Sequence, residues 1–205
     1  FVAARKAWVN DNALPDLFNY DDGKRWRIGL DQYFGNLSIT GISADVRNYY
    51  PVAGRTSLAS WFLLRANIGK SSNEFRRFWG EYPFHGRSWR SFTEEECLFS
   101  DSLSYVNSST GCSLRDDMMG SGIVYGNVAL RFPVLDHFRG GWGGPPIGGE
   151  LFCETGTPFN DFAELSRART LKSACGAKLR TGFFGMVFGF GPIYTPDREK
   201  KLRWK

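Results

Sequence analysis

Residues 121–135 read SGIVYGNVALRFPVL, and apolar side chains alternate along this stretch with polar or small ones. One set holds Val128, Leu130 and Phe132, and the other holds Asn127, Ala129 and Arg131. Successive side chains of a β-strand point to opposite faces, so a period of two separates these sets onto the two sides of one strand. The stretch predicts a strand with one apolar face and one face that carries charge.

The same period returns on both sides of this stretch. It is present in residues 25–31, 39–50, 58–68, 148–159, 171–181 and 186–194, and residues 201–205 begin a further strand. Charged residues such as Arg47, Arg65 and Arg180 fall on one face, opposite Val, Ile, Leu and Ala. The chain is therefore predicted to be all-β and antiparallel with about eight strands, and only residues 161–170 indicate a short helix.

Residues 70–120 interrupt the alternation. They are rich in Ser, Glu, Asp, Gly and aromatic residues and show no sustained period. Ordinary connections between strands are about 4–6 residues long, so this segment is too long to be one of them. We expect one long ordered loop within a single domain that covers residues 1–205.

Composition excludes two classes of protein. The chain has 205 residues, of which 16% are aromatic and 23% charged, and it contains 24 glycines; so many aromatic residues exclude an intrinsically disordered protein. The mean hydropathy is −0.33, and no apolar run approaches the ~18 residues of a membrane helix, which excludes a helical membrane protein. A membrane barrel is not excluded, because each of its strands needs only about 9–11 residues with every second one apolar.

Strand length separates two β architectures. Strands of soluble sandwiches average about 5–6 residues, and the alternating segments of this chain are longer. A charged face suits the interior of a membrane barrel, whose other face contacts lipid. An antiparallel transmembrane β-barrel is favoured, with a soluble β-sandwich and a lipocalin-like barrel as the alternatives.

The ionisable residues form no catalytic pattern. Neither His85 nor His137 accompanies a G-x-S-x-G nucleophile elbow, and the acidic runs at 94–96 and 116–117 lie in irregular sequence. The four cysteines form no CxxC motif, which argues against a zinc site. The net charge of +5 is dispersed along the chain, which argues against a nucleic-acid partner. We expect a non-enzymatic protein without a metal or cofactor.

Two stretches resemble a known family. They read GNVALRFPV at residues 126–134 and GGELFCETG at residues 148–156. They resemble late strands of the bacterial surface antigen barrels of the outer-membrane protein insertase (BamA-like) superfamily, which read roughly N-x-E-L-R-F-P and F-F-D-A-G. The most similar subgroup is the barrel at the C-terminus of TolB-like propeller proteins. The residues of the barrel motif are Asn127, Arg131, Pro133 and Gly156, and the resemblance covers residues 25–205.

The resemblance implies that an arginine of the long loop enters the barrel and pairs with acidic residues on two strands. In this sequence either Arg87 or His85 fills the arginine position, and Glu154 stands at the acidic position of the second motif. Glu150 shares the face of Glu154, whereas Ala129 replaces the acidic residue of the first motif. Charge-assisted hydrogen bonds between Arg and a carboxylate offset part of the entropy that an ordered loop loses. We expect Arg87 to contact Glu154, with Glu150 as the substitute acceptor.

The four cysteines are expected to behave as two different pairs. The family carries two cysteines that bracket a polar insert, and Cys97 and Cys112 bracket residues 98–111 in the same way. The resemblance therefore implies a disulfide between them, worth ~3 kcal/mol in the chain-entropy model, with two free thiols as the alternative. Cys153 and Cys175 fall on the outward-facing sets of two strands, and because cross-strand bridges demand a strict geometry, we expect two unlinked side chains that face lipid.

The resemblance implies a bacterial outer-membrane barrel that inserts or translocates polypeptides or displays a partner at the cell surface. Its partners would be outer-membrane lipid, client polypeptides and periplasmic domains. A passive transport barrel and a membrane anchor for an upstream propeller or hydrolase domain are the alternatives. Barrels of this family have about twice the predicted number of strands. Because the chain also opens with Phe1 rather than Met, we expect the C-terminal half of a larger barrel or a reduced eight-stranded form.

Overall fold

The computed structural model describes residues 2–15, 20–36, 38–70, 77–78, 98–99, 105–106, 119–135, 147–165, 171–183, 186–196 and 202–204. The long strands are β1 (Val2–Asp11), β3 (Tyr20–Phe34), β4 (Ile39–Ala53), β5 (Thr56–Ile68), β10 (Gly122–Leu135), β11 (Ile147–Phe159) and β12 (Lys172–Phe183). The short ones are β2 (Leu14–Pro15), β6 (Arg77–Phe78), β7 (Leu98–Phe99), β8 (Tyr105–Val106), β9 (Met119–Gly120), β13 (Met186–Phe190), β14 (Pro192–Tyr194) and β15 (Leu202–Trp204), and the helix is α4 (Phe162–Leu165). The all-β prediction is confirmed, as is a short helix within residues 161–170.

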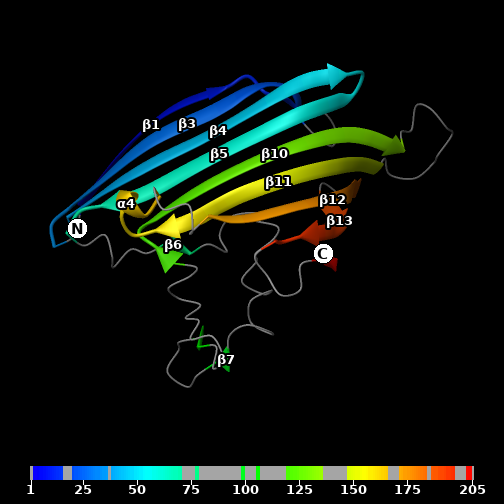
Figure 1. The fold of residues 1–205 in the computed structure, drawn as a ribbon. Coiled ribbons are helices and arrows are strands. Elements are labelled where there is room, and N and C mark those ends of the chain that lie inside the picture. The colour runs from blue at the N-terminus through cyan, green and yellow to red at the C-terminus, as the bar shows by residue number, and fades with distance from the viewer. Residues whose placement is uncertain are drawn as a thin grey trace.

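One antiparallel sheet contains all the long strands. Its path runs β1-β3-β4-β5-β10-β11-β12-β14-β15, with β2 paired to β3 and β13 paired to β12. Figure 1 shows the long strands side by side as one curved sheet. Within the described residues, β1 and β15 form the two edges and do not pair with each other.

The long segment after β5 returns the chain to the neighbouring position in the sheet. β10 pairs directly with β5, although residues 69–121 separate the two strands in sequence. The described pieces of this segment form two small ladders, β6 with β9 and β7 with β8. The rest of the predicted loop at 70–120 lies outside the described residues.

The sequence predicts about eight strands, and the long strand that it misses is β1, because the alternation revealed no strand before residue 25. β1 pairs with β3 along its whole length, from Val2 to Asp11. Its side chains are exposed on both faces, and the neighbouring charges of Arg5 and Lys6 fall on opposite faces, so no two-residue period marks it. The described sheet has nine strands along its path.

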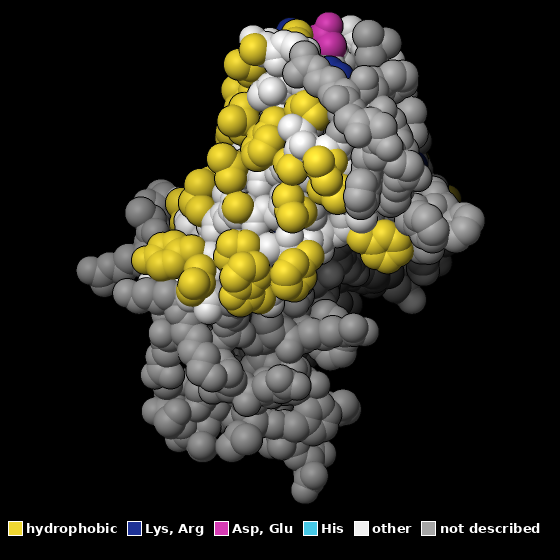
Figure 2. All heavy atoms as spheres, turned by 90° about the vertical axis from the view of Figure 1, so that its right-hand side faces the viewer, with side chains coloured by type: hydrophobic (Ala, Val, Ile, Leu, Met, Phe, Trp, Pro, Cys, Tyr) yellow, Lys and Arg dark blue, Asp and Glu magenta, His cyan; other side chains and the backbone are white. Residues whose placement is uncertain are grey.

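The two faces of the sheet differ as the alternation predicts. In β11, Glu150, Phe152 and Glu154 are buried, whereas Leu151 and Cys153 between them are exposed. The face of Leu151, called the outer face below, carries large exposed apolar side chains from strands across the sheet: Trp8, Ile28, Leu30, Phe62, Val128, Leu151, Leu179, Phe190 and Trp204. In Figure 2, hydrophobic side chains cover much of the side turned to the viewer, and the coloured charged ones lie at its upper margin.

The opposite, inner face carries the buried core and most of the charged contacts. Its apolar cluster consists of Tyr49, Ala59, Ala129, Phe152, Ala174 and Ile193. Phe152 is 3% exposed and stands directly opposite Ala129 on one side and Gly176 on the other. Among the described residues, no helix is long and apolar enough to cross a lipid bilayer.

A close backbone approach divides the strand predicted at 186–194. β13 and β14 both pair with β12, but Gly191 separates them. A Cβ atom built on Gly191 would overlap with the carbonyl oxygen of Ala177 and the Cα atom of Lys178. These are backbone atoms and cannot rotate away, so only glycine fits this position.

We predict that Gly191→Ala lowers the free energy of unfolding by about 1–3 kcal/mol, because the added methyl group overpacks a backbone contact. The measurement is urea unfolding in detergent followed by circular dichroism. Gly126→Ala is the matched control, since a Cβ atom there meets only Thr155 Cγ2 at 4.0 Å. Equal stability of the two variants would show that the chain does not pass this closely beside β12.

Candidate functional site

Three cationic side chains converge on one carboxylate on the inner face, and we call this group the Glu150 cluster. Glu150 Oε2 accepts hydrogen bonds from Arg131 Nε at 3.0 Å and from Arg180 Nη1 at 2.7 Å. Lys178 Nζ lies 3.1 Å from the other oxygen, Oε1. The side chain of Glu150 is 5% exposed and those of the three cations are 14–20% exposed. Water and salt therefore screen these ion pairs only weakly.

Strand register assembles this cluster. Glu150 of β11 stands directly opposite Arg131 of β10 and directly opposite Lys178 of β12. Arg180 follows two residues later on β12 and so shares the same face. Side chains directly opposed in an antiparallel pair have Cβ atoms about 4.5–5.5 Å apart, which is within reach of an ion pair. The cluster thus links three neighbouring strands through their side chains.

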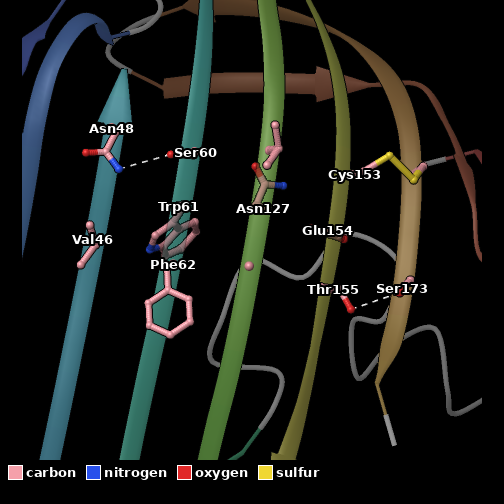
Figure 3. A pocket seen from close by; sticks show the side chains of 13 residues that line it. Val46, Asn48, Ser60, Trp61, Phe62, Asn127, Cys153, Glu154, Thr155 and Ser173 are labelled. Atoms are coloured by element: carbon pink, nitrogen blue, oxygen red, sulfur yellow. Dashed lines mark hydrogen bonds between the residues drawn. A yellow bond between two sulfur atoms is a disulfide. The ribbon is translucent and has the colours of Figure 1, made fainter. Parts of the chain in front are cut away.

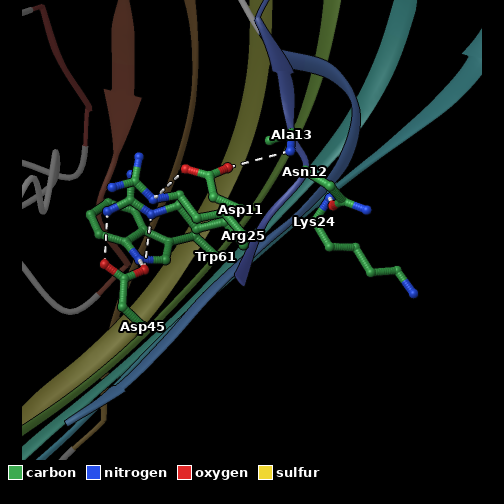
Figure 4. A network of polar contacts seen from close by, with 8 residues as sticks. Asp11, Asn12, Ala13, Lys24, Arg25, Asp45 and Trp61 are labelled. Carbon is green, nitrogen blue, oxygen red and sulfur yellow. Dashed lines mark hydrogen bonds and ion pairs between the residues drawn. The ribbon is translucent and has the colours of Figure 1, made fainter. Parts of the chain in front are cut away.

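A second network on the inner face runs from β4 to β11. Asp45 accepts two hydrogen bonds from Arg47, both at 2.9 Å, and one from Trp61 Nε1, also at 2.9 Å. Figure 4 shows the Asp45 carboxylate facing the Trp61 indole. The Trp61 ring meets the Tyr125 ring edge to face with centroids 5.1 Å apart, and the Tyr125 hydroxyl donates to Glu154 Oε2 at 2.9 Å.

One cation–π contact lies within the second network, and another joins the Glu150 cluster to the apolar cluster. The Arg47 guanidinium lies 4.4 Å from the centre of the Trp61 ring. Lys178 Nζ lies 4.8 Å from the centre of the Phe152 ring, two residues after Glu150 on the same face of β11. Such contacts contribute most where the cation has lost water, as it has on this half-buried face.

Ion pairs continue to the N-terminal edge, but there they are exposed. Arg5 Nε lies 2.7 Å from Asp31 Oδ1, and Arg25 Nε lies 3.5 Å from Asp11 Oδ2. Exposed pairs of this kind add little to stability. The ion pairs that support the fold are therefore concentrated in the middle of the sheet.

The inner face offers polar groups of both signs, whereas the outer face offers mostly hydrocarbon surface. In the described part of the chain, no group of three or more His, Cys, Asp and Glu side chains could hold a metal ion. In the described part of the chain, charged groups therefore gather on the inner face and apolar side chains on the outer face.

The residues of the barrel motif all belong to the ladder that pairs β10 with β11. Asn127 stands opposite Glu154, Arg131 opposite Glu150, Pro133 opposite Gly148, and Gly156 opposite Tyr125. The sequence did not identify Trp61, Asp45 or Tyr125 as members of a network. The alternation places Asp45 on the charged face, and the same parity would have placed Trp61 and Tyr125 on the inner face.

Glu154 and Glu150 lie buried on one face, as their spacing predicts. Arg87 and His85, the two residues proposed to meet them, lie outside the described residues, so the loop contact stays a prediction. The same holds for the bridge between Cys97 and Cys112. The three basic partners of Glu150 could not be identified from sequence, because their meeting depends on register across three strands.

The prediction that Cys153 and Cys175 are unlinked is wrong, because a disulfide joins them. The two residues stand directly opposite each other in the pairing of β11 with β12, and their Cα atoms are 4.1 Å apart. This distance is close to the ~4.5 Å of a non-hydrogen-bonded antiparallel pair, where facing side chains come nearest. The alternation correctly placed both on the outer face but did not provide the register that brings them together.

A hollow of about 470 Å³ lies beside the disulfide on the outer face. Small and polar side chains line much of it, and they form hydrogen bonds with one another. Asn48 Nδ2 donates to Ser60 Oγ at 3.4 Å, and Ser173 Oγ donates to Thr155 Oγ1 at 3.1 Å (Figure 3). Cys153 and Cys175 form part of its wall, so the sulfur atoms border open space.

We predict that Glu150→Gln lowers the free energy of unfolding by about 3–5 kcal/mol, because the three half-buried cations then face a neutral amide. Urea unfolding followed by tryptophan fluorescence measures this change. Asp31→Asn serves as control, since its partner Arg5 is largely exposed, and we expect that variant to be almost as stable as the unchanged chain. If the two variants were equally stable, the cluster would have no central role in the fold.

Comparison with known proteins identifies the fold. No family model matches the sequence, and no curated protein matches it. Among solved structures, one similar fold is that of BamA from Haemophilus ducreyi lacking POTRA domains 1–3, with 12% sequence identity and a TM-score of 0.60. The match covers 99% of this chain and 40% of the BamA chain. The sheet of this protein therefore has the fold of part of a BamA barrel.

Proposed function

We propose that this chain forms part of an outer-membrane β-barrel of the insertase type, with its outer face in contact with lipid. The observation that carries this proposal is the division between the two faces in a sheet with the fold of a BamA barrel. Glu150 and Glu154 are buried among polar partners on the inner face, whereas Val128 and Leu151 are about half exposed on the outer face. Apolar side chains exposed over a whole face are stable next to hydrocarbon and costly next to water.

We further propose that the barrel acts on other polypeptides through its edge strands and without bond-making chemistry. An edge strand presents unpaired backbone N–H and C=O groups that can pair with an added strand. In the described part of the chain, three residue pairs join β15 to β14, and the other side of β15 has no paired strand there. The proposed partners are outer-membrane lipid, client polypeptides that contribute a strand, and periplasmic domains of the same protein.

Charge placement tests the membrane contact. We predict that Val128→Arg reduces insertion into phospholipid vesicles, because an arginine on the lipid face costs about 2–4 kcal/mol at mid-membrane depth. Asn127→Arg is the matched control, since Asn127 is the adjacent residue on the inner face. Insertion is measured as protection from protease after vesicle flotation. Equal insertion of the two variants would mean that the outer face does not contact lipid.

Photo-crosslinking tests the action on polypeptides. We predict that a photoreactive residue at Trp204, on the edge strand β15, crosslinks to an unfolded barrel precursor during insertion. The same residue at Leu151 should not, because β11 is paired on both sides although Leu151 is exposed on the same face. Crosslinks at neither position, in a chain that inserts normally, would favour a passive barrel or a membrane anchor instead.

A further inference from the structure

We propose that the Cys153–Cys175 disulfide is a reducible staple that fixes the register of β11 and β12 and stops strand separation from spreading inward from the C-terminal edge. The proposal depends on strand pairing and on the positions of the two sulfur atoms. It does not require the outer face to contact lipid, nor the barrel to act on polypeptides.

Among the described residues, β11 and β12 are the last two strands on the C-terminal side that share a long run of residue pairs, and the staple joins them. β11 and β12 share ten residue pairs. β12 then shares five with β13 and two with β14, and β14 shares three with β15. Cys175 is bonded to Cys153 on one side and stands opposite Tyr194 of β14 on the other. A fluctuation that separates β14 and β13 from β12 therefore reaches a covalent bond at the next strand.

The disulfide adds to what the ion pairs specify about the register of β11 against β12, because four of the ten residue pairs of this ladder contain a glycine. Gly148, Gly149 and Gly156 of β11 and Gly176 of β12 offer no side chain to specify which residues pair. A cross-strand disulfide forms only between residues in facing positions. It therefore excludes every shifted pairing of these two strands.

The staple acts together with the Glu150 cluster on the opposite face. Glu150 stands opposite Lys178, three residue pairs away from the two cysteines. A shift of two residues would keep each side chain on its own face but would separate both Glu150 from Lys178 and the two sulfur atoms. The ion pairs can break and re-form during such a shift, whereas the disulfide cannot break without a reductant.

Outside a lipid bilayer, the bond is open to a small dithiol. Cys153 is exposed, Cys175 is half-buried, and both border the hollow on the outer face. A thiolate of the dithiol attacks one sulfur, which breaks the S–S bond and releases the other cysteine as a thiolate that takes up a proton. The second thiol of the dithiol then displaces the first cysteine. Two electrons pass to the protein, both cysteines become thiols, and the dithiol leaves as a cyclic disulfide.

The test compares backbone amide hydrogen exchange in the unchanged chain and in Cys153→Ala/Cys175→Ala, both folded in detergent without reductant. A double variant is used because dithiothreitol would also reduce any bridge between Cys97 and Cys112. We expect exchange in residues 147–156 and 172–181 to become at least about tenfold faster in the variant, since the loop closure that the bond supplies is lost. Exchange in β4 and β5 should not change.

A disulfide placed at a neighbouring facing pair shows whether the native bond acts by fixing the register or whether the alanine variant merely loses packing. Leu151 and Ala177 are the next facing pair on the outer face, so Leu151→Cys/Ala177→Cys can be added to the double alanine variant. We expect the new bond to restore slow exchange in β11 and β12, whereas Leu151→Cys alone, added to the double alanine variant, should leave exchange fast. Unchanged exchange in the double alanine variant, or free thiols at Cys153 and Cys175 found by alkylation and mass spectrometry of the untreated protein, would overturn the proposal.

Discussion

The antiparallel register that joins β10, β11 and β12 determines which side chains meet on each face. Glu150 faces Arg131 and Lys178, and one residue pair further along, Leu151 faces Leu130 and Ala177. A shift of a single residue would turn Glu150 toward the outer face and leave its three cations without their carboxylate. An isolated half-buried charge costs far more than an exposed one. The register thus creates these ion pairs, and any other register would cost energy because it would break them.

The two networks of the inner face solve the same problem in different ways. The Glu150 cluster satisfies one carboxylate with three cations, so its favourable energy depends on charge. The second network satisfies Asp45 with Arg47 and the Trp61 indole, and it then passes through the Tyr125 ring to Glu154. Aromatic rings supply apolar area on a polar wall, and their N–H and O–H groups still find acceptors. The inner face can thus be closely packed and charged at the same time.

Alternation in the sequence was sufficient to predict the long strands after β1 and the two faces, because both follow from a two-residue period. Cys153 was placed on the outer face and Glu154 on the inner face without any knowledge of the neighbouring strands. The disulfide, the partners of Glu150 and the strand β1 could not be predicted in this way. Each of them depends on pairing between strands, and in β1 the adjacent charges of Arg5 and Lys6 hide the period as well. Period fixes the face of a side chain, but only register fixes its neighbour.

The two edges of the described sheet differ in how firmly they are held. β1 pairs with β3 over ten residues, and the exposed ion pairs of Arg5 with Asp31 and of Arg25 with Asp11 add little to that pairing. β15 pairs with β14 over three residues, with one stacked contact between Trp204 and Phe190. Among the described residues, an opening that starts at β15 meets its first covalent bond between strands at the disulfide that joins β11 to β12.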